Sequence, residues 1–96
     1  MNLNWESGAT REFVEAAGYF GNIDPDLGDR FISAVEVAIA RLKAAPQLFR
    51  RFDGAARKVR VERFPYAVVY WLDGDVIHII AVLHLHREPG YWRERI

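Results

Sequence analysis

The sequence contains no cysteine, so disulfide bonds and thiolate chemistry are excluded. It also carries no excess charge, because 13 Lys and Arg balance 13 Asp and Glu in 96 residues. Domains that bind nucleic-acid phosphates are normally basic, so this neutrality argues against such binding. No apolar run approaches the roughly 20 residues that cross a membrane, and no signal peptide is apparent at the N-terminus. We therefore expect a protein of the cytoplasm without membrane contact.

The composition is that of one folded domain spanning residues 1–96. Apolar residues make up 51% of the chain, which is ample for a packed core. The charge is unevenly spread: residues 1–49 hold seven acids and four bases, whereas residues 50–96 hold nine bases and six acids. The C-terminal half therefore has a balance of +3, and it also contains the least ordinary segment of the sequence.

Two helices are predicted in the first half, after a short strand over residues 2–6. Ser7 can cap the first helix, and Gly21-Asn22 is a suitable end for it. Asp24 is a good N-cap for the second helix, and Pro25 suits the first helical position. Because the helices are close in sequence, they are expected to form an antiparallel hairpin.

The second half changes to the period of two that is typical of strands. After a loop over residues 47–56, Val59 and Val61 point one way and the charged residues between them point the other. Asp73-Gly74 between two apolar runs is a strong hairpin signal. In the last strand, simple alternation places residues 77, 79, 81 and 83 on one face and residues 76, 78, 80, 82 and 84 on the other.

These elements predict an α+β fold in which an N-terminal two-helix hairpin packs on one face of a mainly antiparallel, curved sheet. The other face should stay partly open. By alternation it would display the following side chains: Lys58, Arg60, Glu62, His78 and His84.

The ordered set of motifs resembles the RelE/ParE superfamily of bacterial type II toxins over nearly the whole chain. The residues that carry the resemblance are Ala9, Leu27-x-x-x-Phe31, Leu42-x-x-x-Pro46, Arg57-Lys58-Val59-Arg60-Val61, Phe64-Pro65-Tyr66 with Tyr70, and His84-x-x-Arg87. The resemblance implies a growth-inhibiting toxin that a cognate antitoxin neutralises in a hetero-oligomer. It leaves two targets open. ParE-like members inhibit DNA gyrase, whereas RelE-like members cleave mRNA on the ribosome without a metal.

The ribonuclease alternative requires a base, an acid and cations around one phosphate. Glu62 or His84 could be the base, and Tyr91 or a histidine could be the acid. The cations that could stabilise the developing charge are Arg60, Arg63 and Arg87. These six residues are the catalytic candidates if the chain is an enzyme. The neutral charge favours the gyrase alternative.

Target binding is the second role considered for the charged and aromatic side chains. The candidates are Lys58, Arg60, Arg87, Tyr91 and Trp92. A plainer alternative is that the basic residues only solvate the sheet surface. Similarly, Trp92 is expected to fold back and pack, because an exposed ring would leave an apolar patch.

No cofactor or metal is expected. His78, His84 and His86 alternate along a strand, but residues 78 and 84 are too far apart to share an ion without a bend. The central expectation is instead that Arg60, His84 and Arg87 converge in a hollow on the uncovered face of the sheet.

Overall fold

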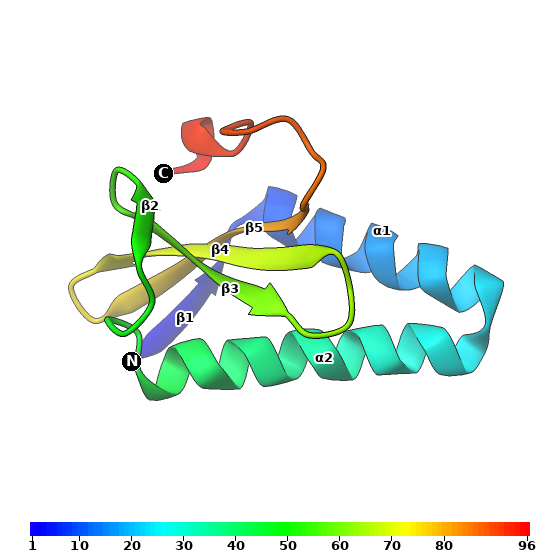
Figure 1. The fold of residues 1–96 in the computed structure, drawn as a ribbon. Coiled ribbons are helices and arrows are strands. Elements are labelled where there is room, and N and C mark those ends of the chain that lie inside the picture. The colour runs from blue at the N-terminus through cyan, green and yellow to red at the C-terminus, as the bar shows by residue number, and fades with distance from the viewer.

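The computed structural model describes every residue from Met1 to Ile96. Its helices and strands, in chain order, are β1 Asn2–Trp5, α1 Ser7–Ile23, α2 Pro25–Ala44, β2 Arg51–Asp53, β3 Ala56–Val61, β4 Tyr66–Asp73 and β5 Val76–His84, and a 3-10 turn follows at Arg93–Arg95. The strands form one sheet in the order β1-β5-β4-β3-β2, in which only β1 and β5 are parallel. The helices run antiparallel beside each other against this sheet (Figure 1). The predicted fold class is confirmed.

The two helices are joined through a single residue, Asp24. Its backbone N–H is bonded to the Phe20 carbonyl at the end of α1, and its side chain accepts the Asp26 N–H at the start of α2. The predicted cap of α2 is therefore confirmed. The predicted start of α1 is wrong, because the Glu6 carboxylate, not Ser7, accepts the Gly8 N–H at 2.8 Å.

The predicted end of α1 at Gly21-Asn22 is also wrong, since the helix continues to Ile23. The chain leaves the helix only at Asp24, whose backbone is extended and whose side chain caps α2. A Cβ added at Gly28 of α2 would lie 2.8 Å from the Cα of Gly21, whereas a Cβ added at Gly21 would meet nothing within 4 Å, so the missing side chain of Gly28 allows the close contact between the helices.

The main core lies between the helices and one face of the sheet. The buried stripe of α2 is Phe31, Val35, Ala38 and Leu42, as its spacing predicts. It packs on inward-facing sheet residues, which are Val59, Val61, Val68, Tyr70, Ile77, Ile79 and Val82. No helix has the length and apolar character that a membrane span requires.

The region 47–56, predicted as a loop, contains the short edge strand β2. This strand pairs with β3 through Arg51–Arg57 and Asp53–Ala56, and the register shifts between the two pairs. A strand of three residues with an irregular register leaves no recognisable period in the sequence, which explains why it was missed.

The alternation predicted for the last strand fails after Ile79 because β5 contains a bulge. Val69 of β4 pairs with Ala81, but the next residue, Tyr70, pairs with Ile79, so Ile80 is left as an extra residue. One extra residue reverses the two faces of the strand from that point on. His84 therefore lies on the helix side of the sheet, where its ring contacts Tyr66 at 5.1 Å, and not on the open side.

Two glycines of the helical hairpin should respond in opposite ways to the same substitution. Gly28→Ala should lower the free energy of unfolding by about 1–3 kcal/mol, because the new methyl group meets the Gly21 backbone. Gly18→Ala, where a Cβ meets nothing, should raise it by up to about 1 kcal/mol through helix propensity. Urea unfolding of both variants measures the difference, and equal effects would contradict the close helix contact.

Candidate functional site

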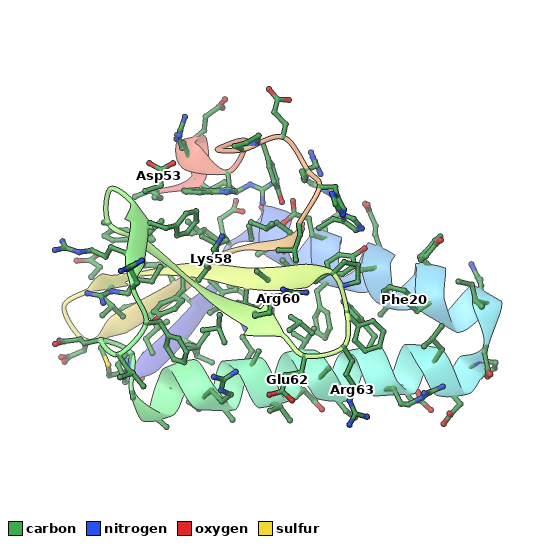
Figure 2. The ribbon with its side chains drawn as sticks, viewed as in Figure 1. Phe20, Asp53, Lys58, Arg60, Glu62 and Arg63 are labelled. Carbon is green, nitrogen blue, oxygen red and sulfur yellow. The ribbon has the colours of Figure 1, made fainter.

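The structure distributes the candidate site residues over three places. Lys58 and Arg60 lie on β3, facing the open side of the sheet, and Glu62 and Arg63 lie in the turn beside α2 (Figure 2). The third group, His84, Arg87 and Tyr91, lies against α1.

The open side of β3 carries two exposed cations. Lys58 lies over the Phe52 ring at 4.7 Å, and Arg60 is opposite Ala67 of β4. Both side chains are exposed, and neither forms an ion pair within 4.0 Å. This arrangement can contact a partner, but it has no neighbouring acid or base with which to move a proton.

The turn between β3 and β4 presents Glu62 and Arg63 to α2. Arg63 has a φ of 71°, a left-handed conformation that a non-glycine residue adopts at some cost. The two residues line a groove of about 330 Å³, which Phe64 also borders. The α2 residues that complete this groove are Leu27, Arg30, Ser33, Ala34 and Val37. The groove is half apolar and carries charged side chains at its edges.

A second hollow, of about 260 Å³, lies between α1 and the segment after β5. We call it the α1–tail hollow. Its lining consists of Glu12, Glu15, Ala16 and Tyr19 from α1, Tyr66 and Val82 from the sheet, and His84, Arg87 and Tyr91. His84, Arg87 and Tyr91, three of the candidate residues from the sequence, thus share one site. Arg87 lies 4.0 Å above the Tyr91 ring.

Hydrogen bonding defines which nitrogen of His84 can donate into the α1–tail hollow. Nδ1 accepts the backbone N–H of His86 at 3.1 Å, so in the neutral ring the proton is on Nε2. Burial raises the pKa of Tyr91 well above its ordinary range, and the neighbouring Glu12 carboxylate raises it further. Tyr91 therefore stays a protonated hydrogen-bond donor.

The expected convergence of Arg60, His84 and Arg87 on the open face is wrong. Arg60 points to the open side, whereas His84 and Arg87 line the hollow beside α1. The bulge at Ile80 is the physical cause, because it moves His84 to the helix side. Glu62 and Arg63 are separated from both groups in the groove beside α2. No three potential metal-ligating side chains lie close together anywhere in the structure.

Comparison with known proteins agrees with this fold. The family model described as "ParE toxin of type II toxin-antitoxin system, parDE" matches residues 3–89. The chain belongs to the ParE toxin family. This membership favours the ParE-like alternative of the sequence analysis over the RelE-like one.

Individual relatives support the assignment to the ParE family. Toxin ParE2 of Mycobacterium tuberculosis, from strains CDC 1551 / Oshkosh and H37Rv, is 28% identical over 89 residues, which cover 92% of this chain and 85% of the relative. The solved structure described as the chromosomal ParDE TA system from P. aeruginosa has a TM-score of 0.66 at 18% identity. It covers 88% of this chain and 95% of the other, and it shows that the fold is shared.

The ParE family match ends at residue 89, and the residues beyond it form a docked tail. Trp92 is only 2% exposed and packs on the open side of the sheet against Ala56, Val69 and Ala81. Arg93 forms an ion pair with Asp53 at 2.6 Å. The expectation that Trp92 packs is confirmed. Its role in target binding stays a prediction, and the burial of the Trp92 ring does not favour that role.

Arg95 connects this tail to α1 and β5 of the ParE fold. Its guanidinium pairs with Glu12 at 3.0 Å and Glu6 at 3.6 Å, and it donates to the Ile80 carbonyl at 2.9 Å. Burial works against the charged form of Arg95, but the bond and charge of Glu12, followed by Glu6, outweigh it and raise the pKa. Glu12 also accepts the Val82 N–H at 3.1 Å. These bonds satisfy the Ile80 carbonyl and the Val82 N–H, which lie at the edge of β5 beyond Ile79, the last residue that pairs with β1.

Sequence reasoning missed Glu12 and Arg95 altogether. One signal for Glu12 was available: it lies three residues after the buried Ala9 and four before the buried Ala16, on the same helix face. A carboxylate at such a position requires a partner, since buried charges are normally paired. Nothing local in the sequence identified that partner, which lies 83 residues away.

Breaking this ion pair from one side should destabilise the ParE fold. Arg95→Met leaves the Glu12 carboxylate, whose side chain is 11% exposed, with only the Val82 N–H. The free energy of unfolding should fall by about 3 kcal/mol, which is near the lower end of the range for buried ion pairs that lose one partner. The double variant Glu12→Gln/Arg95→Met should recover part of the loss, because no unpaired charge remains at position 12. Chemical unfolding measures both, and a double variant less stable than Arg95→Met would contradict this account.

Proposed function

We propose that this ParE-family toxin acts in the cytoplasm by binding and inhibiting DNA gyrase, and that its antitoxin holds it inactive in a hetero-oligomer. Family membership establishes the toxin–antitoxin role, and the choice of a binding mechanism is supported by one structural observation. The residues nominated for RNA cleavage do not all surround a common point, because only His84, Arg87 and Tyr91 share a site. They occupy the open sheet face, the groove beside α2 and the α1–tail hollow.

Cleavage of RNA by a 2′-hydroxyl group requires proton transfer and charge stabilisation at a single phosphate. His84, Arg87 and Tyr91 share one hollow, but Arg60 lies on the open sheet face and Glu62 and Arg63 lie in the groove beside α2, so only one of the three candidate guanidinium groups could act together with His84. This separation supports a toxin that needs only a complementary surface for its target.

Tyr91 is also poorly suited to act as a general acid. Burial and Glu12 raise its pKa, which makes release of the phenol proton less favourable. Arg87 lies 4.0 Å and Arg95 lies 5.2 Å from its ring centre, so two guanidinium groups also contact the ring. These contacts suit a side chain that supports the tail and its neighbours.

The groove beside α2 is the surface that we assign to the antitoxin. It is half apolar, and Val37 at its edge is 53% exposed, although a valine normally gains by burial. Arg30 and Arg63 add charge at the rim. An antitoxin segment that folds on binding suits such a groove, because it buries apolar side chains and pairs with rim charges.

The target can be identified by comparing supercoiling with mRNA integrity. Purified toxin should block the supercoiling of relaxed plasmid by gyrase, and equimolar antitoxin should restore it. Primer extension on transcripts from cells expressing the toxin should show intact mRNA. Cleavage within translated frames together with normal supercoiling would reverse this assignment in favour of the ribonuclease.

The antitoxin surface can be tested with matched substitutions on the two helices. Val37→Glu places a charge in the apolar part of the groove and should weaken antitoxin binding by at least about tenfold, since burial of one such side chain contributes about 1.5 kcal/mol or more. Val14→Glu, at a residue that is 64% exposed on α1 and does not line the groove, should change binding less than about twofold. Calorimetric titration provides both affinities, and equal losses would rule out the groove.

A further inference from the structure

The charges of this chain are separated in space, although their sum is zero. Residues 41–58 hold six bases and one acid, whereas the rest of the chain holds seven bases and twelve acids. These residues form the end of α2, the loop after it, β2 and the start of β3, which lie together at one end of the molecule (Figure 1). We call this region the basic end, and its bases are Arg41, Lys43, Arg50, Arg51, Arg57 and Lys58. The overall neutrality that argued against phosphate binding therefore does not describe this part of the surface.

No base of the basic end forms an ion pair with a carboxylate. Elsewhere in the chain, four bases have a carboxylate within 4.0 Å, and these are Arg11, Arg30, Arg93 and Arg95. The single acid of the basic end, Asp53, is already paired with Arg93 of the tail. All six cations are exposed or partly exposed to solvent, so their charge is available to a partner.

Two of these cations lie directly opposite each other in the sheet. Arg51 of β2 pairs with Arg57 of β3, and like charges in such a position are unfavourable. The Arg57 guanidinium also donates to the Gln47 and Phe49 carbonyls, at 3.1 and 2.8 Å, which holds it beside the loop. Charged residues do protect an exposed edge strand from pairing with another sheet, but an acid opposite Arg57 would serve this purpose without repulsion. The repulsion therefore indicates a use for the accumulated positive charge.

Aromatic rings support two further cations of the basic end. Arg41 lies over the Phe49 ring at 5.4 Å, and Lys58 lies over the Phe52 ring at 4.7 Å. The Phe52 ring contacts in turn the ring of the buried Trp92, at a centroid distance of 5.5 Å. These contacts restrict long side chains before a partner arrives, which lowers the entropy cost of binding.

We infer that the basic end binds the phosphate backbone of duplex DNA, so that the toxin contacts the DNA on which gyrase acts. This inference rests on the proposed function, in which the target is an enzyme bound to DNA. A duplex carries one negative charge per about 1.7 Å of its axis, and binding to it requires several cations. The acidic remainder of the chain is repelled by DNA, so the separation of charge also turns the basic end toward the duplex.

A phosphate backbone suits the basic end better than an acidic segment of a protein does. Neither the groove beside α2 nor the α1–tail hollow includes any of its residues. The cores of protein interfaces are rich in apolar side chains and poor in charged ones, whereas Leu48 and Phe52 are the only large apolar residues exposed here. The basic end thus offers positive charge without a pocket for a partner's side chains, and contacts with phosphates require little more than that charge.

The salt dependence of binding to a short labelled DNA duplex, measured by fluorescence anisotropy, tests this inference. The logarithm of the binding constant should fall with the logarithm of salt concentration with a slope of about −3 or steeper, since each phosphate contact contributes about −0.9. Arg51→Gln/Lys58→Gln should make the slope less steep by about 1.8 and weaken binding at low salt at least about tenfold. Because this variant removes the repulsion between Arg51 and Arg57, its melting temperature should stay close to or above that of the wild type.

A control variant removes the same number of charges outside the basic end. Arg11→Gln/Arg30→Gln, at two exposed helix residues, should change the affinity for the duplex less than about threefold. Equal losses in the two double variants would overturn the inference, as would a wild-type toxin that shows no salt-dependent binding. Single-stranded RNA should bind no more tightly than the duplex. Tighter binding of RNA would also overturn the inference and would favour the ribonuclease alternative.

Inhibition of gyrase then tests the basic end in the complete system. Arg51→Gln/Lys58→Gln should weaken the inhibition of supercoiling at least about fivefold, while antitoxin affinity stays close to that of the wild type. If wild-type toxin inhibits gyrase and the variant does so equally, the inference fails and the proposed function stands. If antitoxin affinity falls instead, the basic end belongs to the antitoxin interface and the inference also fails. If the wild type leaves gyrase unaffected, the proposed function fails, and the assignment of this DNA contact to gyrase fails with it.

Discussion

One extra residue in β5 determines how the functional side chains of this protein are arranged. The bulge at Ile80 turns Val82 and His84 toward the helices, so the end of the strand contributes to the α1–tail hollow. It also lies at the edge where β1 no longer pairs with β5, and the Ile80 carbonyl and Val82 N–H there are bonded by Arg95 and Glu12. The position of the tail therefore follows from the same irregularity that positions His84.

The regular parts of the fold could be predicted because their causes are local. The cap at Asp24, the proline at position 25 and the apolar stripe of α2 act within a few residues, and the structure has them as expected. The bulge at Ile80 could not be predicted, because every residue from Val76 to Val82 except His78 is apolar, and an apolar run does not reveal its register. The error about His84 followed directly from that uncertainty.

The candidate site shows a related limit. His84, Arg87 and Tyr91 are within eight residues of one another, and the structure brings them together as their proximity suggested. Arg60 is just as close in sequence to Glu62 and Arg63, but the tight turn after β3 places those two residues in the groove beside α2 and away from Arg60 on the open face. The partners that complete the hollow, Glu12, Glu15 and Tyr19 of α1, depend on tertiary packing and leave no local pattern. The fold of a toxin therefore does not by itself determine how its charged residues are combined into a site.

The parallel pairing of β1 with β5 joins the two ends of the chain, since Asn4 and His78 are partners across 74 residues. Contacts this distant form late, because closing a long loop costs entropy that nearby contacts do not recover. Strand β5 is bonded to both β1 and β4, so β1 cannot join the sheet before residues 76–84 have been synthesised. During synthesis on the ribosome, the sheet therefore cannot be completed until β5 has emerged.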